Sequence, residues 1–163
     1  MSKEILSQSF NFEGQVALVT GSGRGLGRMI AETLLNGGAA IALHDINEEA
    51  PNAFGESPSL TALAATLSGR GGAKVMSVIG DISKEDDTKA MVKKVEAALG
   101  PISILVNCAG GDIAAKGGKP NPNDALYISL EDAHAVMNRN FMGTMLMCRA
   151  VVPGMVQRQN GAV

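Results

Sequence analysis

The sequence is poor in the side chains that most often carry acid–base and metal chemistry. Its 163 residues include no Trp, one Tyr, two His and two Cys. Tyr127 is therefore the only candidate for a mechanism that uses a tyrosine as general acid or base. Cys108 and Cys148 form no CxxC pair, which argues against zinc and disulfide frameworks and favours reduced thiols in the cytoplasm. We expect no metal site.

An excess of charge of one sign and long hydrophobic runs are also lacking. The chain has 14 Lys and Arg against 16 Asp and Glu, so it lacks the basic surface that attracts nucleic acids or anionic membranes. The first residues, MSKEILSQSF, have no apolar signal-peptide core, and Arg149 and Pro153 interrupt the most apolar stretch, 141–156. We therefore expect neither a membrane span nor a nucleic-acid partner.

Short apolar runs alternate with longer amphipathic ones, which is the pattern of a parallel sheet covered by helices. The predicted strands are 16–20, 39–45, 73–79 and 102–107, and Ala162 begins a fifth. Consecutive apolar residues such as VALVT indicate strands buried on both faces. The sequence predicts an α/β fold, a doubly wound parallel sheet of the Rossmann type. Residues 1–163 are expected to form one dinucleotide-binding domain.

Four helical segments are predicted around these strands. They cover 25–36, 59–68, a segment that opens at Ser83, and a long region from Ser129 to about Gln159. In the last two, a serine N-cap is followed three residues later by an acid, Asp86 or Asp132, which is the pattern of a capping box. Gly143 and Pro153 lie inside the long region, so we expect a break or kink there.

The segment between the first strand and the first helix reads TGSGRGLG, from Thr20 to Gly27. A glycine turn at the carboxyl end of a strand brings backbone N–H groups and the positive helix end to one point, which suits a pyrophosphate. Leu26 stands where GxGxxG requires its third glycine, and the GxxxxGK pattern of nucleotide triphosphatases does not match either. The spacing that does match is TGxxxGxG, through Thr20, Gly21, Gly25 and Gly27.

Three further motifs follow in order. Asp81 and Ile82 come after the third strand, NCAG at 107–110 after the fourth, and Asn140 lies in NRNFMGT. Together with TGxxxGxG they resemble the short-chain dehydrogenase/reductase family over about residues 12–163, although Cys108 replaces the second Asn of the family's NNAG. The resemblance implies an NAD(P)-dependent oxidoreductase for small alcohols and ketones, with Asn140 in its catalytic tetrad. It also implies the spatial order 3-2-1-4 for the four predicted strands. It implies cofactor contacts by Gly21, Arg24, Gly25, Leu26, Gly27, Asp45, Asp81, Ile82, Asn107, Ala109 and Gly110.

The choice between the two nicotinamide cofactors depends on the end of the second strand. Asp45 is placed there to accept hydrogen bonds from the adenosine ribose, and its carboxylate would repel a 2′-phosphate. Arg24 in the glycine loop pulls the other way, because a basic residue there favours the 2′-phosphate of NADP. We expect NAD, with NADP the less favoured cofactor.

The resemblance also implies a catalytic Ser, and a Tyr followed four positions later by a Lys. Tyr127 does not match, because it precedes Asn140 and is followed at that spacing by Glu131. We expect the Ser, Tyr and Lys to come after Ala162, outside these 163 residues, so that the domain is truncated at its C-terminus. The chain alone should then transfer no hydride.

Two other properties follow from this arrangement. An uncovered fourth strand and a Met-rich last helix predict self-association, so we expect a homo-oligomer. A different function stays open, in which the chain is a non-catalytic NAD-binding or regulatory module that needs no Ser, Tyr or Lys. An S-adenosylmethionine methyltransferase has a similar glycine turn but gives no reason for NCAG or Asn140.

Overall fold

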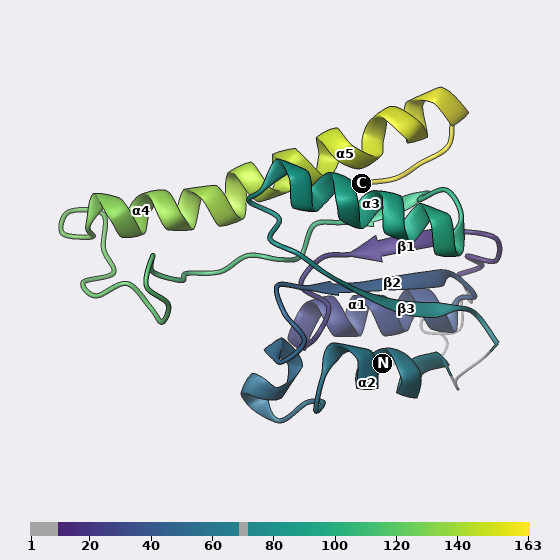
Figure 1. The fold of residues 1–163 in the computed structure, drawn as a ribbon, viewed down its shortest axis with the longest axis horizontal. Coiled ribbons are helices and arrows are strands. Elements are labelled where there is room, and N and C mark those ends of the chain that lie inside the picture. Colours follow the sequence, from purple (N-terminus) through teal and green to yellow (C-terminus); the bar gives the residue numbers. More distant parts are fainter. Residues whose placement is uncertain (1–9, 69–71) are drawn as a thin grey trace, which may run out of the picture.

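A computed structural model describes residues 10–68 and 72–163. The expectation of no signal-peptide core concerns residues that lie almost wholly outside these ranges. The described chain forms a four-stranded parallel sheet in the order β3-β2-β1-β4 (Figure 1), as predicted. Its strands are β1 Val16–Val19, β2 Ala40–Asp45, β3 Val75–Ile79 and β4 Ile104–Val106.

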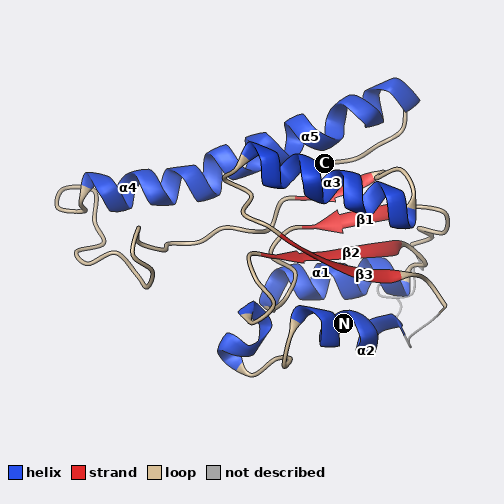
Figure 2. Ribbon diagram, viewed as in Figure 1, coloured by secondary structure: helices blue, strands red, loops and turns tan. Residues whose placement is uncertain are grey.

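Helices cover both faces of the sheet, which confirms the doubly wound fold (Figures 1 and 2). On one face lie α1 Gly25–Asn36 and α2 Leu60–Ser68, and on the other lie α3 Glu85–Leu99 and α5 Gly143–Arg158. A short 3₁₀ helix, η2 Ala50–Phe54, precedes α2. The helix α4 Leu130–Met137 runs almost in line with α5 and extends past the end of the sheet (Figure 1).

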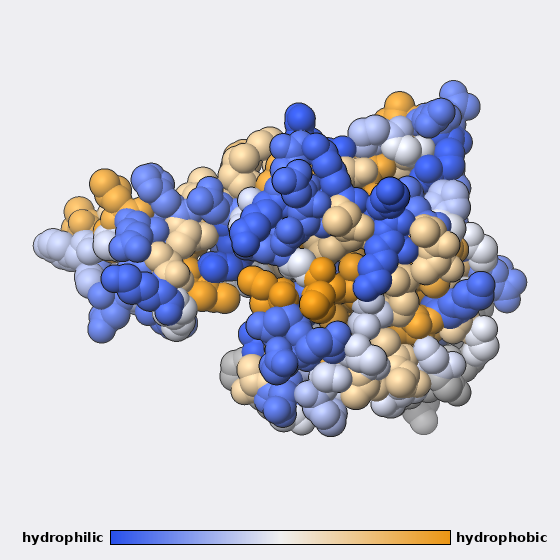
Figure 3. Space-filling view, viewed as in Figure 1, coloured by the Kyte–Doolittle hydropathy of each residue, from blue (hydrophilic) through white to orange (hydrophobic). Residues whose placement is uncertain are grey.

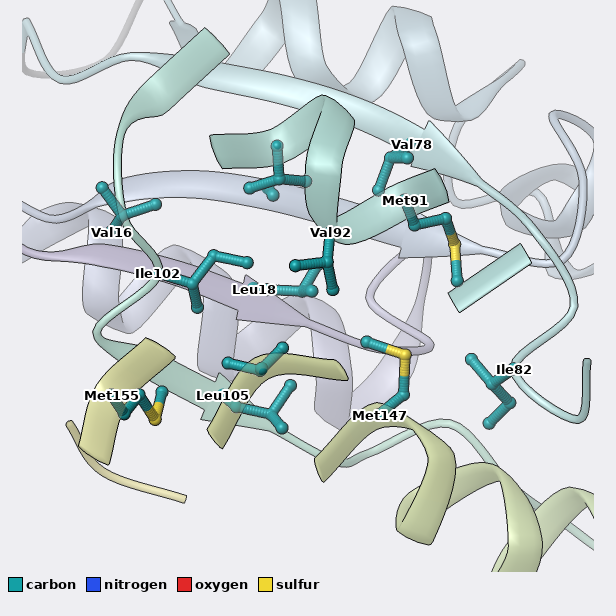
Figure 4. Packing of buried hydrophobic residues seen from close by; sticks show 13 residues of the cluster. Val16, Leu18, Val78, Ile82, Met91, Val92, Ile102, Leu105, Met147 and Met155 are labelled. Carbon is teal, nitrogen blue, oxygen red and sulfur yellow. The ribbon is translucent and has the colours of Figure 1, made fainter. Parts of the chain in front are cut away.

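The alternation of side chains along β1 separates two hydrophobic cores. Ala17 and Val19 pack toward α1 and α2, while Val16 and Leu18 pack toward α3 and α5 (Figure 4). Leu18 is fully buried, and burying a side chain of this size stabilises a fold by about 1.5–3 kcal/mol. Because both faces are covered, the strands need continuous apolar sequence, which is why VALVT predicts β1 so well.

The capping prediction is right at Ser129 and wrong at Ser83. Ser129 is the N-cap of α4, and its hydroxyl accepts the N–H of Asp132 at 3.1 Å. Helix α3 begins one residue after Lys84, which makes no side-chain cap. Ser83 instead donates its hydroxyl to Oδ1 of Asp81 at 2.7 Å. The bond from a hydroxyl to a charged carboxylate is stronger than the bond from a helix amide to a neutral hydroxyl. Ser83 therefore bonds to Asp81 instead of capping the helix.

The break in the long helical region lies earlier than predicted. Residues Asn138–Met142 form a π-helical segment between α4 and α5, and α5 continues without interruption through Pro153. Val151 and Met155, on either side of the proline, are both buried in the core, so packing outweighs the lost backbone hydrogen bond. Gly143 begins α5 where a Cβ would lie 2.7 Å from Cδ1 of Ile82, so glycine is needed there for close packing.

The last residues return to the sheet. Ala162 forms an isolated parallel bridge with Ile104 of β4. Its N–H donates to Ser103 O at 2.9 Å, and its carbonyl accepts the N–H of Leu105 at 3.0 Å. The expected start of a fifth strand is therefore confirmed at this position.

Large apolar side chains are exposed at several places on the surface. Apolar atoms lie in the middle of the face in Figure 3, over the free edge of the sheet at β3, where Ile79 is exposed. Leu130 and Phe141, on the rod formed by α4 and the π segment, are also exposed. In the part of the chain that the structure describes, no helix has the length and apolar character to cross a bilayer.

Candidate dinucleotide-binding site

The parallel strands end at one edge of the sheet, and β1 is flanked there by β2 and β4. In such sheets the chain leaves neighbouring strands in opposite directions at the switch point, which opens a crevice at the carboxyl ends. A cavity of about 300 Å³ lies here. It is lined by residues that follow all four strands, and this convergence makes it the candidate site.

Thr20 joins the glycine loop to the loop after β4. Its hydroxyl accepts the N–H groups of Cys108 and Ala109, both at 3.0 Å, and donates to Val106 O at 3.3 Å. One side chain thus fixes the TGxxxGxG and NCAG motifs against each other. Because buried N–H groups need acceptors, the bond pattern explains why a hydroxyl residue stands at this position.

Two glycines of the loop are required by close contacts. A Cβ on Gly21, whose φ is 64°, would lie 2.7 Å from Cα of Ala109. A Cβ on Gly27 would lie 2.3 Å from the carbonyl oxygen of Gly21. The loop is therefore folded tightly onto the first turn of α1 and against the loop after β4.

His44 is a buried residue of the site to which sequence reasoning gave no role. Its Nδ1 accepts the N–H of Gly21 at 3.3 Å, and its Nε2 lies 3.0 Å from the carbonyl oxygen of Gly80. The carbonyl requires a donor, so the neutral Nε2–H tautomer fits both bonds. Burial lowers the pKa of His44, and this outweighs the bond to Gly80 and the charges of Asp45 and Asp81. A buried strand position directly before Asp45 is the only sequence signal for this role.

Asp45 lies at the end of β2, beside the glycine loop. A Cβ on Gly23 would lie 2.6 Å from its Oδ2, and its Oδ1 accepts the N–H of Ile46 at 2.9 Å. Asp45 and Arg24 both line the cavity. The carboxylate and the guanidinium that favour different cofactors therefore lie in the same site.

Asp81 follows β3 and is held by its neighbours. It accepts the N–H of Ser83 at 3.0 Å in addition to the hydroxyl, and Lys84 Nζ lies 3.7 Å from its Oδ2. Partial burial raises the pKa of Asp81, but the bonds from Ser83 and the charges of Lys84 and Arg139 outweigh it and hold the pKa below the usual value. Asp81 is therefore an ionised acceptor, and the adjacent Ile82 provides apolar lining.

The cavity brings together most of the predicted cofactor residues. Those that line it are Gly21, Arg24, Asp45, Asp81, Ile82, Ala109 and Gly110. Gly25, Leu26, Gly27 and Asn107 are not among the lining residues. Leu26 is 71% exposed on the first turn of α1. Gly27 packs against the backbone of Gly21. Sequence reasoning missed Ile113 and Arg139, which also line the cavity.

Asn107 contains an unusual buried atom. Its Nδ2 donates to Sγ of Cys148 at 3.6 Å, but its buried Oδ1 has no hydrogen-bond partner in the described structure. Buried polar atoms are normally satisfied, so such an oxygen indicates a missing donor such as water. Asn107 does not line the cavity, so the observation that fits a bound dinucleotide is the glycine cradle, where a Cβ on Gly21 would meet Cα of Ala109.

Asn140 lies in the π segment and holds the loop after NCAG. Its Oδ1 accepts the N–H of Gly111 at 2.8 Å, while its Nδ2 donates to the carbonyls of Gly111 and Val136 at 2.9 and 2.8 Å. A Cβ on Gly110 would lie 2.5 Å from the same Oδ1. π-Helical segments recur at functional sites. The predicted catalytic role of Asn140 stays a prediction.

Other candidate positions lie apart from this site. Tyr127 is 73% exposed in the loop before α4 and does not line the cavity. A larger cavity of about 510 Å³ lies along α3, where Lys84 and Lys94 are among its lining residues. It lacks the glycine loop and any residue that follows β1 or β4, so we assign the binding site to the smaller cavity.

Among the described residues, no group of three or more His, Cys, Asp or Glu is placed to hold a metal ion.

The fold is a Rossmann-like α/β fold, with its candidate site at the carboxyl ends of the strands. The family described as short chain dehydrogenase matches residues 15–163. The chain therefore belongs to the short-chain dehydrogenase/reductase family.

Similar proteins include dehydrogenases of sugars and polyols. The chain is 36% identical to D-threitol dehydrogenase of Mycolicibacterium smegmatis, over 97% of this chain and 55% of that protein. It is 36% identical to glucose 1-dehydrogenase of Gluconobacter oxydans, over 86% and 47%. A gluconate 5-dehydrogenase from Burkholderia cenocepacia, in complex with NADP and tartrate, has a similar structure with a TM-score of 0.74 and 31% identity, over 94% and 53%. The chain thus spans about half the length of these relatives.

Proposed function

We propose that this chain forms the dinucleotide-binding part of an NAD(P)-dependent oxidoreductase that interconverts a small alcohol and its ketone. The main support for this proposal is the cavity at the switch point. Gly21, Asp45, Asp81 and Ala109 converge there from the ends of all four strands. Membership of the short-chain dehydrogenase/reductase family supports the reaction class. The sugar and polyol dehydrogenases among the relatives support a small-molecule substrate.

Within this function, NAD is the proposed cofactor. Asp45 lies against the glycine loop, where its carboxylate can accept the ribose hydroxyls and repel a 2′-phosphate. The gluconate 5-dehydrogenase of similar structure was solved with NADP, so the preference rests on the residues of this chain rather than on that relative. The adenosine half would lie between Asp45 and Asp81, and the glycine loop would hold the pyrophosphate.

The second half of the reaction needs groups that hold the nicotinamide and the substrate. Among these 163 residues, Tyr127 is the only tyrosine, and it is not followed by a lysine at the required spacing. We therefore assign hydride transfer to a protein of the relatives' length and cofactor binding to this chain. In that protein Asn140 would belong to the catalytic group.

Calorimetric titration tests the proposal on the chain of 163 residues. NAD and NADP are titrated separately, with S-adenosylmethionine as a control of similar adenosine content. The proposal expects saturable binding of NAD, weaker binding of NADP and no binding of S-adenosylmethionine. Binding of S-adenosylmethionine alone would contradict it.

A further inference from the structure

A second carboxylate contacts the glycine loop from outside the cavity. The N–H of Gly25 donates to both carboxylate oxygens of Glu56, at 3.2 and 3.3 Å. Glu56 is not part of any motif and lies on the connection between β2 and α2. Its carboxylate therefore binds the amide that directly follows Arg24.

The position of Glu56 is set by several contacts. Gly55 turns the chain with a left-handed φ of 71° after η2. Arg28 then donates Nη1 to Glu56 O at 3.0 Å and lies 3.6 Å from Oε2. Pro51 of the same connection packs against the loop, since a Cβ on Gly23 would lie 2.9 Å from its Cγ. The side chain is thus held at the loop from two sides.

Helix capping explains part of this contact. Helix α1 has no acid in its first turn, and Arg24 at its N-cap makes no side-chain cap. Glu56 supplies the missing acceptor and a negative charge that suits the positive helix end. Capping alone requires an acceptor oxygen, whereas an effect on a bound phosphate requires the charge, so the two roles can be separated.

The negative charge of Glu56 lies close to Arg24 and Asp45, the two residues proposed to discriminate between NAD and NADP. Asp45 contacts the loop at Gly23 and Glu56 contacts it at Gly25, so the two carboxylates approach the residues on either side of Arg24. Consecutive Cα atoms are about 3.8 Å apart, so the Cα atoms of Gly23 and Gly25 are at most about 7.6 Å apart. A 2′-phosphate near Arg24 would therefore experience two carboxylates and two guanidinium groups, because Arg28 lies 3.6 Å from Oε2 of Glu56. Removing the charge of Glu56 would leave one carboxylate against two guanidinium groups.

We propose that Glu56 is a second determinant of cofactor specificity, whose carboxylate offsets the charge of Arg24 and disfavours the 2′-phosphate of NADP. This inference rests on the proposed dinucleotide-binding function. It explains how a chain with an arginine in its glycine loop prefers NAD. The effect is electrostatic and partly exposed to solvent, so added salt weakens it.

The Glu56→Gln variant tests the charge without removing the cap, because the amide oxygen can still accept the N–H of Gly25. Dissociation constants of NAD and NADP are measured by calorimetry at low salt for the 163-residue chain and the variant. We expect Glu56→Gln to tighten the binding of NADP about five- to tenfold relative to that of NAD, because both cofactors carry the pyrophosphate and only NADP carries the 2′-phosphate. The gain should shrink at high salt.

Two further variants make the result specific. Glu49→Gln removes the same charge from an exposed position on the same connection and should leave the ratio of the two constants unchanged. Glu56→Ala loses the cap as well and should melt at a lower temperature, yet shift the ratio as much as Glu56→Gln does. An equal change for both cofactors, or no change, overturns this inference alone. Failure of the unaltered chain to bind either cofactor overturns the proposed function and this inference with it.

Discussion

The imidazole of His44 connects Gly21 to Gly80. It accepts the N–H of Gly21 and, in its neutral form, donates to the carbonyl of Gly80. The turns after β1 and β3, which are not neighbours in the sheet, are therefore linked through one buried side chain at the end of the strand between them. Gly21 and Gly80 both line the cavity, so His44 holds two of its lining residues.

Acid should destabilise the fold through His44. Burial lowers the pKa of this side chain below its ordinary 6.5, so the unfolded chain binds a proton at pH values where the folded chain does not. The free energy of unfolding should be fully retained above about pH 6.5 and should fall as the pH drops from there to the lowered pKa. Urea unfolding between pH 8 and 5 measures this slope. His44→Gln should flatten the slope, whereas the exposed His134→Gln should not.

Gly27→Ala should disrupt the glycine loop. The new Cβ would lie 2.3 Å from the carbonyl oxygen of Gly21, and relieving such a contact costs about 1–3 kcal/mol of stability. We expect a lower melting temperature and at least a tenfold loss of NAD affinity, measured by calorimetry. Gly14→Ala provides the control, because Gly14 has a φ of 76° but open space around its Cβ position. It should lose about 1 kcal/mol of stability without any loss of affinity.

Asp45→Ala should relax the preference for NAD. Removing the carboxylate removes both an acceptor for the ribose and a charge that repels the 2′-phosphate, each an effect of about 1–3 kcal/mol. NAD should bind about tenfold more weakly and NADP more tightly. Fluorescence or calorimetric titration with both cofactors measures the two constants. Asp86→Asn, an exposed change on α3, should leave both values as they are, and an unchanged ratio in Asp45→Ala would refute the role.

Asn140→Ala should loosen the loop that follows NCAG. The variant loses three hydrogen bonds, two to Gly111 and one to Val136, and leaves the Gly111 amide without its acceptor. A loss of about 1–3 kcal/mol of stability is expected, together with faster hydrogen exchange at Gly111. Asn138→Ala, at the exposed start of the same segment, should change neither. Unchanged exchange at Gly111 in Asn140→Ala would contradict the assignment.

The exposed apolar side chains on the rod should promote association. Leu130 and Phe141 are 76% and 57% exposed on α4 and the π segment, and burying such groups between chains is favourable. We expect the chain to self-associate at micromolar concentrations in sedimentation velocity experiments. Phe141→Ser should shift the distribution toward the monomer. A monodisperse monomer for the unaltered chain would count against this expectation.

The strands could be predicted from local sequence, and their order from the resemblance of the motifs to the short-chain dehydrogenase/reductase family. Strands buried on both faces are continuous apolar runs, and the glycine turn and the NCAG motif follow β1 and β4 directly, so their residues meet in space once the strands are parallel. The bridge at Ala162 could also be predicted locally, because a turn at Asn160 and Gly161 is followed by the apolar residues Ala162 and Val163. The candidate site was predictable to the extent that each motif ends a strand.

Tertiary contacts decided what the sequence did not predict. Ser83 has the spacing of a cap but lies within reach of Asp81, and the carboxylate is the better partner. From the sequence, His44 is one more residue of a buried strand. Its role becomes visible only in the structure, where it bonds to Gly21 and Gly80. Glu56 is thirty-one positions from Gly25, and no local pattern links the two. The π segment before Gly143 contains no proline or glycine, and its Asn140 makes long-range hydrogen bonds to Gly111 that no local pattern predicts.

The hydroxyl of Thr20 concentrates three of the hydrogen bonds that join two loops on a single atom. Its oxygen is the acceptor for two consecutive backbone amides, at Cys108 and Ala109. Valine has nearly the same shape as threonine, yet it would leave both amides without an acceptor, so the usual conservative exchange would here be twice as costly as for an ordinary hydrogen bond. Serine retains the oxygen and would preserve the junction. Tolerance to substitution at this position therefore depends on the chemistry of the side chain rather than on its volume.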